Sequence, residues 1–163
     1  MKVLIAYASK TGATSKAAKL LAERFSDVTL RDLTVGSPNP NDYEAVILGG
    51  SIRMGLLHKD ARKWLEEYGE VLKTKKFGCF ICHGFSEQAP QLLEQNIPSD
   101  LLEVAVCADS FGGELVEKKL RGMDRLVTKM MLKSFKGELD FVPCIRTDRI
   151  QVFADTFLKT DDY

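Results

Sequence analysis

Short apolar stretches recur along the chain, and segments with a helical spacing of apolar residues lie between most of them. The apolar stretches cover residues 3–8, 28–33, 45–48, 77–82 and 104–108. Each has the length of a buried strand rather than that of a helix. The pattern therefore predicts a strand at each of these places.

Four segments place apolar side chains three or four residues apart, which is the spacing of one face of an α-helix. They cover residues 13–25, 59–72, 87–97 and 148–158. The second is the clearest, because one face collects Ala61, Trp64, Leu65, Tyr68 and Leu72. We expect Asp148 to cap the last helix at its N-terminus.

Alternation of strands and helices predicts an α/β fold with a parallel sheet, helices on both of its faces and right-handed crossovers. The length of 163 residues favours one domain, spanning 1–163, and the chain shows no internal repeat. In such a sheet, ligands bind beyond the carboxyl ends of the strands. The segments that follow the strands are therefore the place to look for a site.

Four of those segments carry glycine and hydroxyl residues together. They are 9–14, 49–55, 83–86 and 109–113. Glycine at these strand ends would let the backbone approach a flat ligand closely. Their convergence is a more specific signal than any one of them alone.

The first of these segments joins an apolar strand directly to a helix. Residues 9–14 read Ser-Lys-Thr-Gly-Ala-Thr. Free backbone N–H groups, the hydroxyls of Ser9, Thr11 and Thr14, and the positive end of a helix dipole suit a phosphate. The loop lacks the glycine pattern of dinucleotide-binding folds and the Gly-Lys-Ser/Thr of nucleoside triphosphatases. It also lacks the acidic cluster that a phospho-accepting receiver domain needs.

Lys plus Arg equals Asp plus Glu, so the formal net charge is zero, which argues against steering toward nucleic acid. No apolar run approaches the roughly 20 residues that span a bilayer. The opening apolar run is interpreted as a strand rather than a signal peptide, which predicts a cytoplasmic protein with reduced cysteines.

Cys79 and Cys82 form a Cys-x-x-Cys pattern inside an apolar strand, so their side chains should point to opposite faces of the sheet. A redox pair would instead stand at a helix N-terminus. These two cysteines, with Cys107 and Cys144, are therefore expected to be packed and inert. No set of residues has metal-ligand spacing, so we expect no metal.

The pattern Ser-x-Thr-Gly-x-Thr, matched by Ser9, Thr11, Gly12, Ala13 and Thr14, resembles the phosphate loop of the flavodoxin family. The resemblance implies a flavodoxin-like three-layer sandwich with a five-stranded parallel sheet in the order 2-1-3-4-5. It also implies FMN as the cofactor, with its phosphate on this loop. Lys10 either supplements the phosphate charge or is simply solvated.

One branch of the family is more similar than the rest. Residues 49–55, with His58, look like the third-strand loop of the menaquinone-dependent protoporphyrinogen oxidase family of flavodoxin-like proteins. Residues 123–138 are similar to the long insert after that family's fifth strand. Two departures set this chain apart, since Met54 replaces an aromatic residue and the region between Gly84 and Val104 looks shorter.

A helical insert is expected at 114–138. Residues 115–136 carry seven cations and two acids, with a basic face and a Met-rich apolar face. Such a helix either packs its apolar face on its own domain or makes peripheral contact with an anionic membrane.

The resemblance implies a cofactor site on three of the segments. The expected FMN-binding residues are Ser9, Lys10, Thr11, Gly12, Ala13, Thr14, Ser51, Ile52, Arg53, Met54, Gly55, His83, Gly84, Phe85 and Ser86. Arg53 and His83 are the candidates for a catalytic role, against the alternatives of a surface ion pair and a satisfied histidine. Met54 or Phe85 is expected to cover a ring face, although Phe85 equally suits the core.

Two functions remain open. The first is an FMN oxidoreductase of the protoporphyrinogen dehydrogenase type, passing electrons to a quinone. The second is a non-catalytic electron-transfer protein that works between redox partner proteins.

Overall fold

A computed structural model describes residues 1–84, 86–113 and 144–160. Phe85 and the helical insert expected at 114–138, with its basic face and proposed membrane contact, lie outside the described residues. Within the described part, no helix combines the length and the hydrophobicity needed to cross a bilayer.

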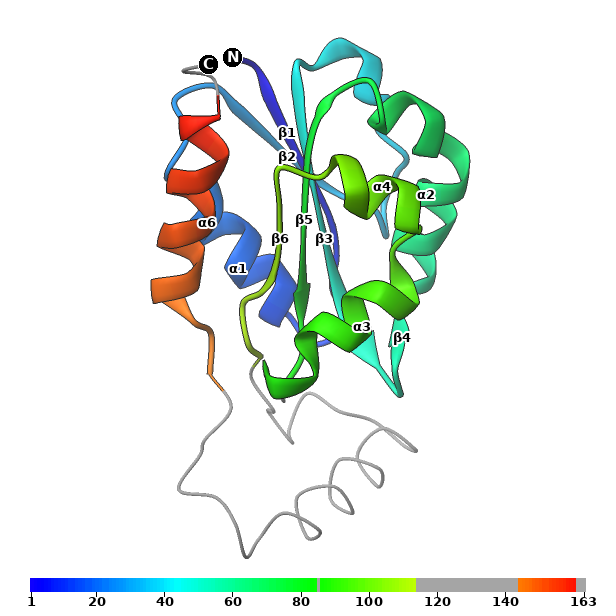
Figure 1. Cartoon of the computed structure of the whole chain (residues 1–163), viewed down its shortest axis with the longest axis vertical. Helices are drawn as coiled ribbons and strands as arrows, with labels where there is room; N and C mark the ends of the chain where they lie inside the picture. Colours follow the sequence, from blue (N-terminus) through cyan, green and yellow to red (C-terminus); the bar gives the residue numbers. More distant parts are fainter. Residues whose placement is uncertain (85, 114–143, 161–163) are drawn as a thin grey trace, which may run out of the picture.

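The described residues form a parallel sheet with helices on both faces, as the alternation of patterns predicted (Figure 1). The strands are β1 (Val3–Ala8), β2 (Val28–Asp32), β3 (Ala45–Arg53), β4 (Leu56–Leu57), β5 (Lys76–Cys82) and β6 (Cys107–Ser110). Their order is β2-β1-β3-β5-β6, with β4 paired to β3 outside this path. The five parallel strands thus follow the expected order 2-1-3-4-5, and β4 adds a short antiparallel hairpin.

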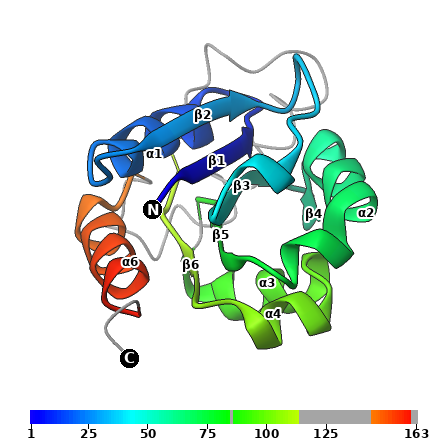
Figure 2. The ribbon, with the colours of Figure 1, turned by 90° about the horizontal axis from the view of Figure 1, so that it is seen from above.

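The helices divide between the two faces of the sheet (Figure 2). They are α1 (Ala13–Ala22), α2 (Lys59–Leu72), α3 (Ala89–Asn96), α4 (Ser99–Val104) and α6 (Thr147–Lys159), with 3-10 turns η1 (Pro40–Asp42) and η2 (Ser86–Gln88). Helices α1 and α6 cover one face, and α2, α3 and α4 cover the other. The molecule therefore has three layers.

Alternating residues of the buried strands separate the core into two clusters. In β1, which is buried throughout, Leu4 and Ala6 face α2, whereas Ile5 and Tyr7 face α1. The α1 side also contains stacked Phe80 and Phe111 rings with centroids 4.5 Å apart. A strand buried on both faces explains why β1 reads as a continuous apolar run.

Two boundaries differ from those predicted. The strand expected at 104–108 begins only at Cys107, because Val104 is the last residue of the short helix α4. A helix of six residues is too short to show a recognisable period. Helix α6 begins at Thr147 with Arg146 as its N-cap, and Asp148 in the first turn accepts hydrogen bonds from the Arg146 guanidinium instead of capping.

Candidate functional site

The carboxyl ends of the parallel strands gather the predicted site segments at one edge of the sheet, which is the lower edge in Figure 1. The first segment turns sharply at Gly12, whose φ of 96° is the left-handed conformation that glycine adopts at little cost. The Gly12 N–H donates to Ser9 Oγ at 3.0 Å, and the Lys16 N–H donates to the Gly12 carbonyl. Helix α1 begins at Ala13, directly after this turn.

Thr14 lies in the first turn of α1, and its side chain has an unusual environment. It is fully buried, and its Oγ1 is the only buried side-chain nitrogen or oxygen in the described residues without a hydrogen-bond partner. The Cys82 thiol lies beside this hydroxyl but lacks the geometry of a hydrogen bond with it, and burial raises the pKa of Cys82 to about 12. A buried hydroxyl left unpaired costs about 1–3 kcal/mol, so this position suits a ligand oxygen that would pair with it.

The segment 49–55 is mostly strand rather than the loop that the sequence suggested. Strand β3 continues to Arg53, and only Met54 and Gly55 form the turn into β4. Both turn residues have positive φ, 51° at Met54 and 77° at Gly55, as in the type I′ turns of tight hairpins. Because Ile52 and Arg53 pair with β4, only the turn of this segment lies outside the strand pairing.

Gly49 and Gly50 have a role in the packing of the core. A Cβ atom at Gly49 would lie 2.2 Å from Cζ of Phe80, and one at Gly50 would lie 2.3 Å from Cδ1 of Leu57. These glycines therefore make room for neighbouring side chains of the core.

The hairpin is held by a residue that the sequence analysis missed. Asn96, the last residue of α3, donates to the Gly55 carbonyl at 2.9 Å and accepts the Leu57 N–H at 2.8 Å. No local pattern signals this contact, because it joins residues 41 and 39 positions apart.

The segments after β5 and β6 lie against each other. The His83 N–H donates to the Gly112 carbonyl at 3.0 Å, and a Cβ atom at Gly113 would lie 3.2 Å from the His83 carbonyl carbon. His83 and Gly84 are half-buried at this edge, Phe85 is outside the described residues, and Ser86 begins η2. The structure thus places the described parts of all four segments along one edge.

His58 joins the hairpin to α2 and stands near the first segment. Its backbone N–H donates to the Ser51 carbonyl, and its Nδ1 accepts the Asp60 N–H at 3.2 Å, which caps α2. Burial lowers the pKa of His58, and the charge of Lys10 adds to this effect while Asp60 opposes it. Lys10 therefore lies within electrostatic reach of His58.

The cysteines mostly follow expectation. Cys79 and Cys82 are free and buried, in the two separate core clusters on opposite faces of the sheet. Burial raises the pKa of Cys79 and of Cys107 to about 12, so both thiols stay protonated. The expectation of packing is wrong for Cys144, which is exposed. No group of three potential metal ligands occurs in 1–84, 86–113 or 144–160.

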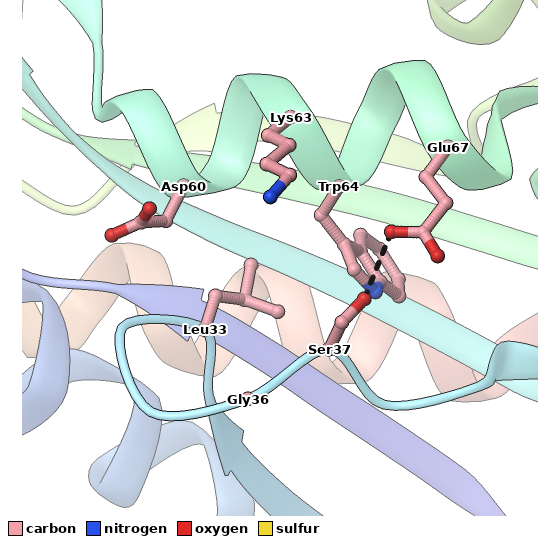
Figure 3. Close-up of a pocket in the computed structure, with 7 residues that line it drawn as sticks. All are labelled: Leu33, Gly36, Ser37, Asp60, Lys63, Trp64 and Glu67. Carbon is pink, nitrogen blue, oxygen red and sulfur yellow. Dashed lines mark hydrogen bonds between the residues drawn. The ribbon is translucent and has the colours of Figure 1, made fainter.

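A separate cavity of about 240 Å³ lies between the loop after β2 and helix α2 (Figure 3). Its lining residues are Leu33, Gly36, Ser37, Asp60, Lys63, Trp64 and Glu67. Ser37 donates to Glu67 across its rim at 3.0 Å, and the Trp64 indole N–H donates to the Pro38 carbonyl. None of the predicted site residues lines this cavity, so it is distinct from the candidate site.

The three-layer fold places this chain in the class of open α/β sheets, in which ligands bind at the carboxyl ends of the parallel strands. The model of the flavodoxin domain family matches residues 4–141. The chain therefore belongs to the flavodoxin domain family. Its flavodoxin-like homologues bind FMN.

Solved structures show the same fold at low sequence identity. Oxidised flavodoxin 2 from Bacillus cereus is 19% identical with a TM-score of 0.60, covering 98% of this chain and 99% of that one. Oxidised flavodoxin 1 from the same organism is 16% identical with a TM-score of 0.58, covering 98% of both chains. These identities show a shared fold and nothing finer.

A larger protein contains a similar unit. Rubredoxin oxygen:oxidoreductase from the anaerobe Desulfovibrio gigas is 18% identical with a TM-score of 0.54, over 93% of this chain but only 36% of that protein. This chain thus spans about a third of that relative's length. No curated protein matches the sequence.

Proposed function

We propose that this chain binds FMN at the carboxyl edge of its sheet and acts as an FMN-dependent oxidoreductase. The observation that carries the proposal is the buried, unpartnered hydroxyl of Thr14 at the N-terminus of α1. It stands beside a left-handed glycine and a helix end, where a phosphate is favoured by backbone N–H groups and by the helix dipole. Family membership supplies the ligand that fits this chemistry.

The phosphate would rest on Ser9, Lys10, Thr11, Gly12, Ala13 and Thr14. The flavin ring would lie between the hairpin and the segment after β5. The hairpin would contribute Ser51, Ile52, Arg53, Met54 and Gly55, and the segment after β5 would contribute His83, Gly84, Phe85 and Ser86. FMN, when bound, supplies one- and two-electron redox chemistry. The protein's part is to hold the ring edge with turn backbone and to place Arg53 as a cation beside it.

Replacing Thr14 by valine tests the phosphate seat, because valine has the same shape and lacks the hydroxyl. We expect the apoprotein to gain about 1 kcal/mol of unfolding free energy, since a buried unpaired hydroxyl is removed. We expect FMN binding to weaken by roughly ten- to hundredfold, the loss of one hydrogen bond to a charged group. Urea unfolding and fluorescence titration measure the two effects.

Thr74→Val is the matched control. The Thr74 hydroxyl donates to the Val71 carbonyl at the far end of α2, so this change should cost a little stability and leave FMN affinity unaltered. An apoprotein destabilised by Thr14→Val, or FMN affinity equal to that of the native chain, would contradict the proposed role of Thr14. A native chain that takes up no FMN would end the proposal as a whole.

The finer proposal is an oxidoreductase of the protoporphyrinogen dehydrogenase type that passes electrons to a quinone. Supporting it are the similarity of residues 49–55 and His58 to that branch, and an exposed Arg53 at the hairpin end that suits a carboxylate-bearing substrate. This finer proposal includes a cytoplasmic location and peripheral membrane contact through residues 115–136.

The alternative is a carrier of electrons between redox partner proteins. Exposed Met54 and Leu56 on the hairpin favour it, because they offer apolar surface beside the proposed ring site. Steady-state assays with protoporphyrinogen and a menaquinone analogue separate the two functions. Turnover supports the enzyme, whereas no turnover together with rapid one-electron exchange with a reductase supports the carrier.

A further inference from the structure

The tip of the β3–β4 hairpin has a backbone conformation that its residues do not favour equally. Gly55 adopts its φ of 77° freely, but Met54 has a φ of 51° and carries a Cβ atom. A left-handed conformation is unfavourable for a residue other than glycine. Something outside the turn must therefore hold it in place.

The Asn96 side chain is placed to do this. Its Oδ1 accepts the Leu57 N–H at 2.8 Å, and its Nδ2 donates to the Gly55 and Leu92 carbonyls, both at 2.9 Å. Only one orientation of the amide satisfies all three bonds, because the flipped amide would face an N–H with an NH₂ and two carbonyls with an oxygen. The Asn96 amide is thus held through both its oxygen and its nitrogen.

These bonds connect two parts of the proposed ring site. Strand β4 lies beside α3 (Figure 1), and α3 follows the segment that begins at His83. Asn96 closes the C-terminal turn of α3 through Leu92 while it holds the hairpin through Gly55. The position of the hairpin therefore depends on the position of α3.

We propose that Asn96 is a positioning residue for the flavin ring, because its amide joins the Met54–Gly55 turn to the end of α3 and so presets the backbone that meets the ring. The inference rests on the proposed FMN site. Asn96 does not touch the ring itself. It lowers the conformational cost of binding by holding the turn in one state before the ligand arrives.

The variants Asn96→Asp and Asn96→Leu test this. Aspartate still accepts the Leu57 N–H but faces the Gly55 and Leu92 carbonyls with an oxygen, and leucine removes all three bonds. We expect dissociation constants for FMN and for riboflavin to rise by similar factors of roughly ten. Inorganic phosphate should protect the two variant apoproteins against thermal unfolding to the same extent as it protects the native apoprotein.

Comparing these three ligands separates positioning from a general loss of structure. Riboflavin reports on the ring site, inorganic phosphate reports on the segment 9–14, and FMN reports on both. Asn39→Asp is the matched control, because the Asn39 side chain also accepts a backbone N–H, that of Asn41, in the turn before β3 and away from the site. It should alter none of the three ligands' binding.

A second pair of variants tests the link to turn strain. In a Met54→Gly background the turn is unstrained, so Asn96→Asp should weaken riboflavin binding by a smaller factor than in the native chain. Unchanged flavin affinity in both Asn96 variants, or an equal loss for phosphate, would overturn the positioning role. If the native chain binds phosphate but no flavin, the proposed function itself fails, which is a different result.

Discussion

His58 shows how one side chain at the edge of the sheet can make stability depend on pH. As the N-cap of α2, it accepts the Asp60 N–H through Nδ1 and must be neutral to do so. Burial lowers the pKa of His58 below 6.5, Lys10 and Lys59 lower it further, and Asp60 and Asp32 oppose them. Between the lowered pKa and 6.5, the unfolded chain binds a proton that the folded chain does not. The stability supplied by neutral His58 is therefore present above 6.5 and is lost as the pH falls through the folded value.

We expect His58→Asn to remove this acid-sensitive step, because asparagine caps a helix without titrating. Urea midpoints at about pH 7.5 and 5.5 measure the effect, and the difference between them should shrink in the variant. An undiminished difference in His58→Asn would show that other groups cause the acid sensitivity.

At the scale of elements, the packing around strand β3 explains why the strand needs its glycines. Gly49 lies under the Phe80 ring of β5, so the neighbouring strands fit only if one side chain is absent. Gly69, in the last turn of α2, has open space where a Cβ atom would be. The two positions therefore predict opposite effects of the same substitution.

Gly49→Ala should lower the free energy of unfolding by about 1–3 kcal/mol through overpacking. Gly69→Ala should raise it by about 0.5–1 kcal/mol, because alanine restricts the unfolded chain and favours the helix. Urea unfolding of the two variants gives the comparison. Combining Gly49→Ala with Phe80→Leu should recover part of the loss, and no recovery would argue against the Phe80 contact as its cause.

Most element positions could be predicted from the sequence. Strand β1 and helix α2 have the predicted bounds, 3–8 and 59–72, because a continuous apolar run and a clear helical period are local signals. The end of β3 and the hairpin could not be predicted. Residues 49–53 look like a loop because glycine disfavours strands, whereas pairing with neighbouring strands and packing against Phe80 and Leu57 make strand the stable state there.

At the scale of the molecule, a ligand that binds only the folded state must stabilise the whole domain. FMN at one hundred times its dissociation constant should raise the unfolding free energy by about 2.7 kcal/mol. Urea unfolding with and without FMN measures this, and AMP, which has a phosphate but no flavin, serves as the control ligand. An absence of any shift with FMN would contradict binding to the folded chain.

The sequence by itself determined the α/β class and the strand–turn–helix at residues 9–14 that led us to predict a phosphate site, because each depends on neighbours along the chain: periodicity, a glycine and a helix start. Only the tertiary structure decided what depends on distant residues. It left Thr14 buried without a partner, placed Gly49 under Phe80, and joined Asn96 to a turn about 40 positions away. Burial and hydrogen bonding between remote segments arise from packing, and no local pattern encodes them.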